Sequence, residues 1–248
     1  MEYIQITEDN LEQEHICCAI SNNRDVQVSS KKAWLKDRLA EGLVFLKGAE
    51  RGKCFIEYMP AESAWVPVQA DNYMHINCLW VSGSFKGHGY SNDLLASCIA
   101  DSQKKHKAGL CILSSAKKRG FLADPKYLSH KGFRTADEAP CGIQLWYLPF
   151  DTKSETPRFR TCAKQAGIDV PGTVIYYTHQ CPFNAKYIPL LEAYAKDQNL
   201  PFQAIHIQTK EEAQNAPAPV TPCAVFYDGV YITNETLNEK KFQNLLGV

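Results

Sequence analysis

The sequence lacks long hydrophobic runs and has no excess of charge of either sign. No apolar stretch approaches the roughly 20 residues that a membrane-spanning helix needs, and the first residues lack the basic and apolar segments of a signal peptide. The 27 Lys and Arg balance the 27 Asp and Glu, so no overall field attracts the chain to nucleic acid or to anionic lipid. We therefore expect a soluble cytoplasmic protein with neither nucleic acid nor a membrane as a partner.

Paired cysteines are also missing, although the chain contains ten cysteines. No two of them have Cys-x-x-Cys spacing, and several, such as Cys78 and Cys98, lie in apolar stretches where a free thiol packs as a small hydrophobe. A disulfide scaffold is typical of much shorter secreted chains. We therefore expect reduced thiols, no zinc site and no other metal.

The composition is otherwise that of a globular protein, with 248 residues of which 45% are hydrophobic and 22% charged. At about 100–200 residues per domain, this length suits one large domain or two modest ones. Prolines and glycines gather in residues 149–172, so we predict domains over 1–150 and 151–248. Within that stretch, we expect Thr156 to cap a short helix that ends at Gly167.

The first predicted domain alternates strands with helices, which indicates an α/β fold. We expect strands at 2–6, 43–47, 54–59, 74–81, 110–114 and 142–148, and helices at 9–20, 30–41, 91–106 and 125–131. Apolar residues on both faces of 74–81 are typical of a strand whose sheet is covered on both sides.

A glycine-rich turn joins that strand to the helix over 91–106, with the sequence Ser82-Gly83-Ser84-Phe85-Lys86-Gly87-His88-Gly89-Tyr90-Ser91. Glycines allow a tight turn, and a helix start presents unbonded N–H groups, so the segment predicts a phosphate or pyrophosphate site. A P-loop would need Gly-Lys-Ser/Thr, and a dinucleotide-binding loop would need a third glycine and a later acidic residue. An acyl-CoA loop is the remaining interpretation.

The turn resembles the Gln/Arg-Gly-x-Gly-x-Gly/Ala signature of the GNAT acetyltransferases, and the order of elements over about 1–150 is similar to that family's. Lys86 stands in place of Gln or Arg, and Ser91 in place of the last Gly or Ala. The resemblance implies a mixed sheet with flanking helices and acetyl-CoA as co-substrate. It implies that the cofactor is bound by Leu79, Trp80, Val81, Lys86, Gly87, His88, Gly89, Tyr90 and Ser91.

The charge distribution agrees with an anionic ligand. Between Lys86 and Arg134 there are ten Lys and Arg but three Asp and Glu, a local excess of +7 in a chain that totals zero. Coenzyme A carries a pyrophosphate and a 3′-phosphate, which clustered cations bind. The alternative is a solvated face on which Lys104, Lys105 and Lys107 simply end a helix.

The resemblance also implies direct transfer, in which an amine attacks the thioester while both substrates are bound. An amide of the strand at Leu79–Val81 would polarise the thioester carbonyl. The family's usual tyrosine acid falls on Leu128, so Tyr127 is the candidate that protonates the leaving thiolate. Glu57 and His75, on the central strands, are the candidates for a general base. The alternative for Tyr127 is packing as a buried aromatic, and for Glu57 and His75 it is an exposed side chain or one whose polar groups are satisfied in the core.

The second predicted domain resembles a thioredoxin-like fold, with elements expected in the order βαβ–ββα. Its expected strands are 173–178, 202–208, 224–227 and 230–233, with one helix ending near 196 and a last helix capped by Thr236. Asp228-Gly229 predicts a hairpin turn.

The active-site position of the thioredoxin-like family corresponds to Cys181-Pro182, and its cis-proline to Pro222. Asn184 stands where the second active-site cysteine would be, so a dithiol cycle is not available. A helix start lowers the pKa of a thiol, so Cys181 is a candidate for a reactive thiolate that forms mixed disulfides. The alternative is a domain that serves in binding or shapes the acceptor pocket.

Together the two halves are similar to bacterial GNAT proteins with a YoaP-type C-terminal domain. The sequence thus predicts an acetyl-CoA-dependent N-acetyltransferase with an unidentified amine acceptor, and it does not indicate the oligomeric state. One alternative is a monothiol redox or binding protein whose first half only binds acyl-CoA. Another is a binding module that uses the basic stretch to hold a different anion.

Overall fold

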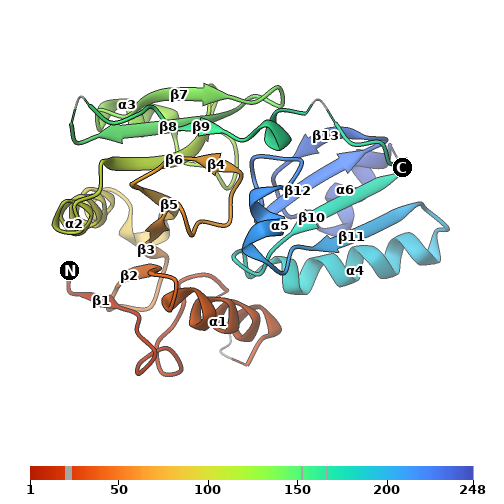
Figure 1. Ribbon diagram of the computed structural model, residues 1–248. Coiled ribbons are helices and arrows are strands. Elements are labelled where there is room, and N and C mark those ends of the chain that lie inside the picture. Colours follow the sequence, from red (N-terminus) through yellow and green to blue (C-terminus); the bar gives the residue numbers. More distant parts are fainter. Residues whose placement is uncertain (20–23, 152, 166, 248) are drawn as a thin grey trace.

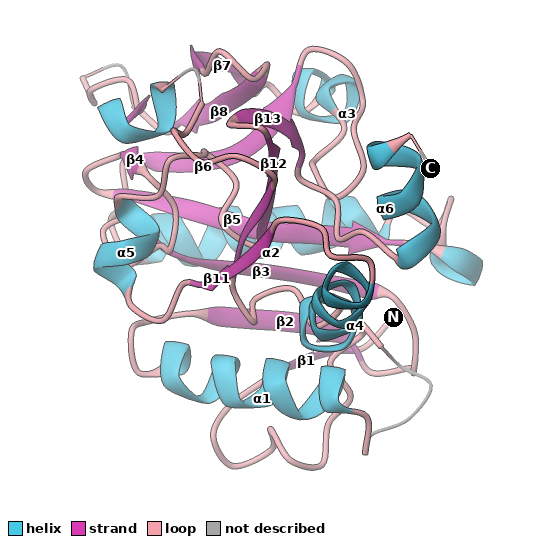
Figure 2. Ribbon diagram, turned by 90° about the vertical axis from the view of Figure 1, so that its right-hand side faces the viewer, coloured by secondary structure: helices cyan, strands magenta, loops and turns pink. Residues whose placement is uncertain are grey.

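Two large β-sheets with flanking helices, and one small two-stranded sheet, make up the computed structural model, which describes residues 1–19, 24–151, 153–165 and 167–247 (Figure 1). The first sheet has seven strands and the second has four. Figure 2 views the molecule from the side of the second sheet, which lies in front of the first. The mixed α/β class expected from the sequence is confirmed.

The first sheet is antiparallel except for one central pair of strands. In order across the sheet, its strands are β1 (Tyr3–Gln5), β2 (Val44–Gly48), β3 (Cys54–Pro60), β5 (Tyr73–Val81), β6 (Gly109–Ser115), β8 (Ile143–Pro149) and β7 (Arg134–Glu138). The parallel pair is β5 with β6. Helix α2 (Tyr90–Lys104) connects these two strands, as a parallel connection requires.

Helices cover both faces of this sheet. On one face, Leu94, Leu95 and Cys98 of α2 pack with Leu128 of α3 (Pro125–His130) in a buried apolar cluster. On the other face, α1 (Val26–Leu39) contributes buried residues to a second cluster. That second cluster also contains Val220 from the second half of the chain, so the two halves share a core.

Strands β5 and β6 separate halfway along their length. Their pairing ends at Ile76 with Ile112, although β5 continues to Val81 and β6 to Ser115. On the other side of β5, Glu57 pairs with Cys78 and Tyr58 with Ile76, so Asn77 is an extra residue without a partner in β3. This is a β-bulge, which bends a strand and increases its twist. The sheet therefore opens at Asn77.

The second sheet has the order β11-β10-β12-β13, and only its β10–β11 pair is parallel. Its elements are β10 (Thr173–Tyr177), α4 (Asn184–Asp197), β11 (Phe202–His206), α5 (Lys210–Gln214), β12 (Cys223–Tyr227), β13 (Val230–Thr233) and α6 (Glu239–Leu246). The expected strands and the two long helices are present. Asp228 and Gly229 both have positive φ, at 46° and 78°, as a two-residue hairpin turn of type I′ requires.

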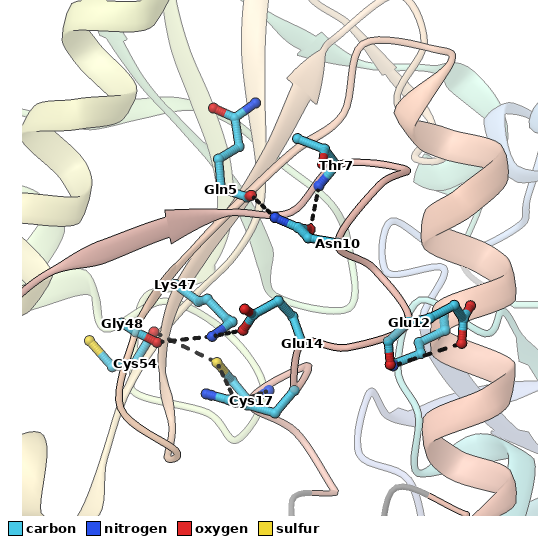
Figure 3. Close-up of polar contacts among 11 residues, drawn as sticks. Gln5, Thr7, Asn10, Glu12, Glu14, Cys17, Lys47, Gly48 and Cys54 are labelled. Atoms are coloured by element: carbon cyan, nitrogen blue, oxygen red, sulfur yellow. Dashed lines mark hydrogen bonds and ion pairs between the residues drawn. The ribbon is translucent and has the colours of Figure 1, made fainter.

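The expected helix over 9–20 is wrong for its described part, which consists of turns (Figure 3). Asn10 hydrogen-bonds the carbonyl of Gln5 and accepts from the N–H of Thr7, a local pattern that competes with helix formation. Glu14 pairs with the fully buried Lys47 at 2.8 Å. Tertiary contacts thus hold this segment. Residue 20 lies outside the described residues.

Three other boundaries differ from the expectation. Asp25 caps α1, which therefore begins at Val26 instead of 30. Asn238 caps α6, whereas the hydroxyl of Thr236 donates to Asn184 Oδ1 at 2.6 Å. The described residues of the connector do not form the α-helix expected after Thr156.

Strand β9 (Arg158–Phe159) occupies the connector instead, followed by a 3₁₀ turn, Thr161–Lys164. β9 pairs with β4 (Val68–Gln69) of the first half. The carboxylate of Asp137 accepts from the N–H of Phe159 and pairs with Lys164 at 2.7 Å, which fixes the connector to strand β7.

Gln214 bridges the two halves with both ends of its amide. Its nitrogen donates to the carbonyls of Glu62 and Ala64, and its oxygen accepts from Arg160 at 2.9 Å. Helix α1 also packs against α4. The joint is therefore hydrogen-bonded as well as apolar.

Replacing Gln214 with leucine tests this joint. Gln214→Leu leaves two carbonyls and a guanidinium without their partner, and we expect the free energy of unfolding to fall by about 1–3 kcal/mol. Gln203→Leu, at an exposed position of β11, is the control and should change it by less than about 0.5 kcal/mol. Equal effects in denaturant titrations would contradict the role of Gln214.

Candidate active site

A cleft of about 600 Å³ lies where β5 and β6 separate. One end is lined by the glycine-rich turn and the start of α2, and the middle by β5 from His75 to Val81 together with Ile112 and Leu113 of β6. The far end is lined by Trp65 and by residues of the second half, including Gln180 and Pro222. One cleft therefore contacts both halves of the chain.

The glycine-rich turn has the backbone that the sequence predicts. Gly87 and Gly89 have φ values of +83° and +80°, a left-handed conformation that favours glycine. Gly89 is the N-cap of α2 and offers no side chain, so the first N–H groups of the helix have no side-chain cap. A Cβ added at either glycine would meet no atom within 4 Å. The space over the turn is therefore open to a ligand.

This cleft is lined by eight of the nine residues that the resemblance assigns to cofactor binding. They are Leu79, Trp80, Val81, Lys86, Gly87, Gly89, Tyr90 and Ser91. His88 is exposed outside the lining, where its ring stacks on that of Tyr90 with centroids 5.5 Å apart.

The basic stretch divides between the two ends of α2. Lys105 pairs with Asp101 at 2.7 Å, and Lys107 pairs with Glu62 at 3.2 Å, at the C-terminal end of the helix and away from the turn. For these two lysines, the solvated helix end is the better interpretation. Lys86, Lys118 and Arg119 line the cleft instead, with Lys118 paired to Asp124 at 3.1 Å.

A hydrogen-bonded series of polar side chains crosses the sheet beside the bulge, and all of them are buried except Asn77, which is half-buried. Lys31 of α1 pairs with Glu57 Oε2 at 2.5 Å, and Asn77 Nδ2 donates to Glu57 Oε1 at 3.0 Å. Asn77 Oδ1 lies 2.9 Å from His75 Nδ1. Glu57 is 1% exposed and does not line the cleft, whereas Asn77 and His75 do. Of the two base candidates, only His75 therefore reaches the cleft directly.

These hydrogen bonds determine which nitrogen of His75 carries the proton. A carboxylate only accepts hydrogen bonds, so Asn77 directs its NH₂ group to Glu57 and its oxygen to His75. Nδ1 of His75 is then the donor, and Nε2 keeps its lone pair. Nε2 is buried and has no hydrogen-bond partner among the described residues. Burial lowers the pKa of His75 to about 4 despite the opposing hydrogen bond that the ring donates to Asn77, so the ring is neutral at pH 7.

Tyr127 also lines the cleft, between β5 and the start of α2. Its hydroxyl donates to the carbonyl of Ser91 at 2.9 Å. Burial raises its pKa, so the phenol holds its proton at neutral pH. Leu128, where the resemblance places the acid, is 1% exposed in the core. The one-residue offset thus brings Tyr127 to the cleft in its place.

Cys181 does not have the environment of a reactive thiol. Burial raises its pKa, contrary to the lowering expected for a thiol at a helix start. Its Sγ lies 4.0 Å from Thr236 Oγ1, and it is not part of the cleft lining. The described residues contain no cis peptide bond, so the bond before Pro222 is trans, unlike the cis-proline that the resemblance implies.

No group of three or more His, Cys, Asp or Glu is arranged to hold a metal ion among the described residues. None of the helices described is long and apolar enough to cross a membrane.

Sequence reasoning missed Lys31, Asn77 and Gln180. Lys31 resembles any other lysine of an amphipathic helix, and Asn77 lies in a strand without a sequence signal for the bulge. Gln180 belongs to no motif of its own, because the thioredoxin-like resemblance concerns the next residue, Cys181. Trp65, Thr221 and Pro222 also line the far end of the cleft.

Comparisons with known proteins point to one family. The sequence profile of the YoaP-like family matches residues 201–244. YoaP of Bacillus subtilis (strain 168), named an uncharacterized N-acetyltransferase, is 44% identical over 247 residues, which cover 99% of this chain and 98% of that protein.

Solved structures of acetyltransferases are similar to part of the chain. PaiA N-acetyltransferase of Thermoplasma acidophilum, in complex with coenzyme A, is 13% identical, covers 60% of this chain and 100% of its own, and has a TM-score of 0.42. YncA of Salmonella typhimurium, with its cofactor acetyl-CoA, is 17% identical, covers 62% and 96%, and has a TM-score of 0.45.

The buried, neutral state of His75 has a measurable effect on stability. Its pKa falls from 6.5 to about 4 on folding, so folding favours the neutral ring. The stabilisation is complete above pH 6.5 and is lost as the pH falls toward 4. Between pH 7 and 4, the wild type should lose about 3 kcal/mol more unfolding free energy than His75→Gln.

The control for this measurement is His130→Gln, at an exposed position of α3. This variant should follow the wild type at every pH. If His75→Gln also runs parallel to the wild type, the ring is hydrated and titrates normally, contrary to the burial described above.

Proposed function

The chain belongs to the YoaP family of GNAT N-acetyltransferases, and from that premise we propose that it transfers the acetyl group of acetyl-CoA to a primary amine. The observation that carries this proposal is the single cleft that runs from the glycine-rich turn to His75. Such a cleft suits two substrates bound at the same time, and therefore direct attack of the amine on the thioester.

The donor end of the cleft fits a nucleotide-linked pyrophosphate. Helix N–H groups without a side-chain cap and the partial positive charge of the α2 terminus favour an anion over the turn. The ligand can approach the backbone because Gly87 and Gly89 leave the space open. Lys86, in the turn itself, adds positive charge along the lining.

The open edge of β5 suits the pantetheine arm and the acetyl group. Leu79, Trp80 and Val81 pair with β3 on one edge, while β6 no longer pairs with the other edge beyond Ile76. Backbone N–H and C=O groups on that free edge are therefore available to a ligand. A thioester supplies an activated acetyl group, and a strand N–H stabilises negative charge that develops on its oxygen.

His75 is the group that we assign to the attacking amine. A primary amine has a pKa near 10 and reacts only as the neutral base. The lone pair of Nε2 accepts an amine N–H, and the bond from Nδ1 to Asn77 holds the ring in that tautomer. Glu57 acts through Asn77 as a positioning residue, since its carboxylate does not reach the cleft.

Tyr127 is the group that we assign to the leaving thiolate. Its hydroxyl is still protonated at neutral pH and lies at the donor side of the cleft. In the present arrangement that proton is donated to the carbonyl of Ser91. To protonate a thiolate, the hydroxyl has to exchange this partner for sulfur.

The division at 150 and the character of the second part also belong to this proposal. We assign 151–248 to a thioredoxin-like domain on the basis of its strand order and helices. The half-buried Cys181, whose pKa is raised by desolvation, supports a role in binding over thiol chemistry. The monothiol redox alternative has no observation in its favour.

Valine at the two glycines tests the donor site. Gly87→Val and Gly89→Val place a branched side chain in the open space and disfavour the positive φ, so acetyl-CoA affinity measured by calorimetry should fall at least about tenfold. Gly247→Val is the control, because Gly247 also has a positive φ and open space but caps α6. Unchanged affinity in the first two variants would refute the assignment of the turn.

Removing the hydroxyl of Tyr127 tests the assignment of the acid. Tyr127→Phe should lower kcat for coenzyme A release by about 100-fold, the usual contribution of a general acid, while the KM for acetyl-CoA changes little. Tyr187→Phe, on α4 outside the cleft, is the control. An unaffected kcat would assign protonation of the thiolate to another group.

A further inference from the structure

Two loops of the second half form the far wall of the cleft. Gln180 lies in the loop after β10, and Thr221 and Pro222 lie just before β12. Trp65 of the first half lines the cleft beside them, and its carbonyl accepts from Thr221. If acetyl-CoA enters from the turn, this wall faces the substrate that attacks the thioester.

Asn184 holds the two loops together. It is completely buried, and its Nδ2 donates to the carbonyl of Thr178 at 3.0 Å and to the carbonyl of Pro222. Its Oδ1 accepts from the hydroxyl of Thr236. A buried side chain with every polar atom bonded keeps its neighbours in one arrangement. The residue at the position of the missing second cysteine is thus a clamp between the loops.

The wall is also fastened to the first half. The hydroxyl of Thr221 donates to the carbonyl of Trp65, which lines the same end of the cleft. Asn234 donates to the carbonyl of Gly120, another lining residue, at 2.8 Å. The wall therefore cannot move away from the cleft without breaking buried hydrogen bonds.

The lining of this end is apolar and carries no free negative charge. Trp65, Val66, Val220 and Pro222 supply apolar surface. Asp124 is the only acidic residue among the described lining residues, and it is paired with Lys118. The side-chain amide of Gln180 has no hydrogen-bond partner among the residues described, so it is available to a ligand.

We propose that the second half forms the acceptor pocket and that Gln180 selects primary amines whose body is uncharged. This inference rests on the proposed acetyl transfer. An apolar wall stabilises an aliphatic or aromatic body, and the Gln180 amide bonds one polar group on it. A second ammonium group would be desolvated there without a carboxylate to pair with, so diamines and polyamines are poor acceptors.

An isosteric pair of amines tests the proposal on the full-length enzyme. n-Hexylamine and 1,5-diaminopentane have the same number of non-hydrogen atoms and differ in the charge of the far end. The wild type should prefer hexylamine in kcat/KM, measured by coenzyme A release. Gln180→Glu places a carboxylate at the wall and should shift the ratio toward the diamine by at least about tenfold. The KM for acetyl-CoA should stay within about twofold.

Gln203→Glu is the matched control, because it adds the same charge to the same half at an exposed site outside the cleft. It should leave the preference unchanged. A ratio that does not move in Gln180→Glu, or that moves equally in Gln203→Glu, overturns the proposal. So does a wild type that prefers the diamine.

The two levels of proposal fail in different ways. Absence of acetyl-CoA binding to the wild type refutes the acetyl transfer itself. If acetyl-CoA binds but neither amine is acetylated, calorimetry with both amines on the enzyme saturated with coenzyme A decides. If the wild type binds hexylamine more tightly than the diamine and Gln180→Glu reverses this order, the result supports the proposed acceptor pocket. If the wild type binds neither amine, the result overturns the proposed acceptor pocket.

Discussion

The β-bulge at Asn77 is the constraint on which the site depends. One extra residue in β5 shifts its register against β3, and at the same point the parallel pairing with β6 ends. Beyond the bulge, β5 keeps its hydrogen bonds to β3 but has a free edge toward the cleft. The bulged residue itself connects Glu57 to His75. A single irregularity thus opens the sheet and orients the neutral histidine.

The second half of the chain completes what the bulge opens. A sheet that separates in its middle exposes apolar strand surface, which must be covered by a ligand or by protein. Here Trp65 and the loops around Asn184 cover the far end, while the end at the glycine-rich turn stays open. The asymmetry gives the cleft one polar, cationic end and one apolar end. These ends suit an anionic cofactor and an uncharged substrate body, respectively.

Much of the fold follows from local patterns, but the site follows only in part. The glycine-rich turn and strand β5 could be predicted because their signals lie within a few neighbouring residues. The turns around Asn10 could not, since Glu14 is held by Lys47, 33 positions away in the chain. Asn77 and Lys31 gain their roles from a register shift and from a helix packed across the sheet. Sequence alone shows neither.

The distribution of basic residues is a second feature that the sequence shows only in part. The excess of +7 over 86–134 is a correct count, but folding pairs Lys105 and Lys107 at the far end of α2. A linear count cannot separate cations that face a ligand from those that end a helix. The positive field at the cleft therefore rests on fewer residues than the count suggests, and more of the anion binding falls to the backbone of the turn.

The energetics of the Lys31–Glu57 pair support a positioning role for Glu57. Both side chains are almost completely buried, at 3% and 1% exposed, and removing two charges from water costs several kcal/mol per ion before their attraction is counted. An apolar pair of similar volume would often be equally stable or more so. Such a pair, however, would leave the NH₂ group of Asn77 without its acceptor. The amide would then be free to turn its nitrogen toward His75, and Nδ1 would become the acceptor. The proton would move to Nε2, and the lone pair beside the cleft would be lost. The charge on Glu57 is therefore better explained by the tautomer that it enforces than by any gain in stability.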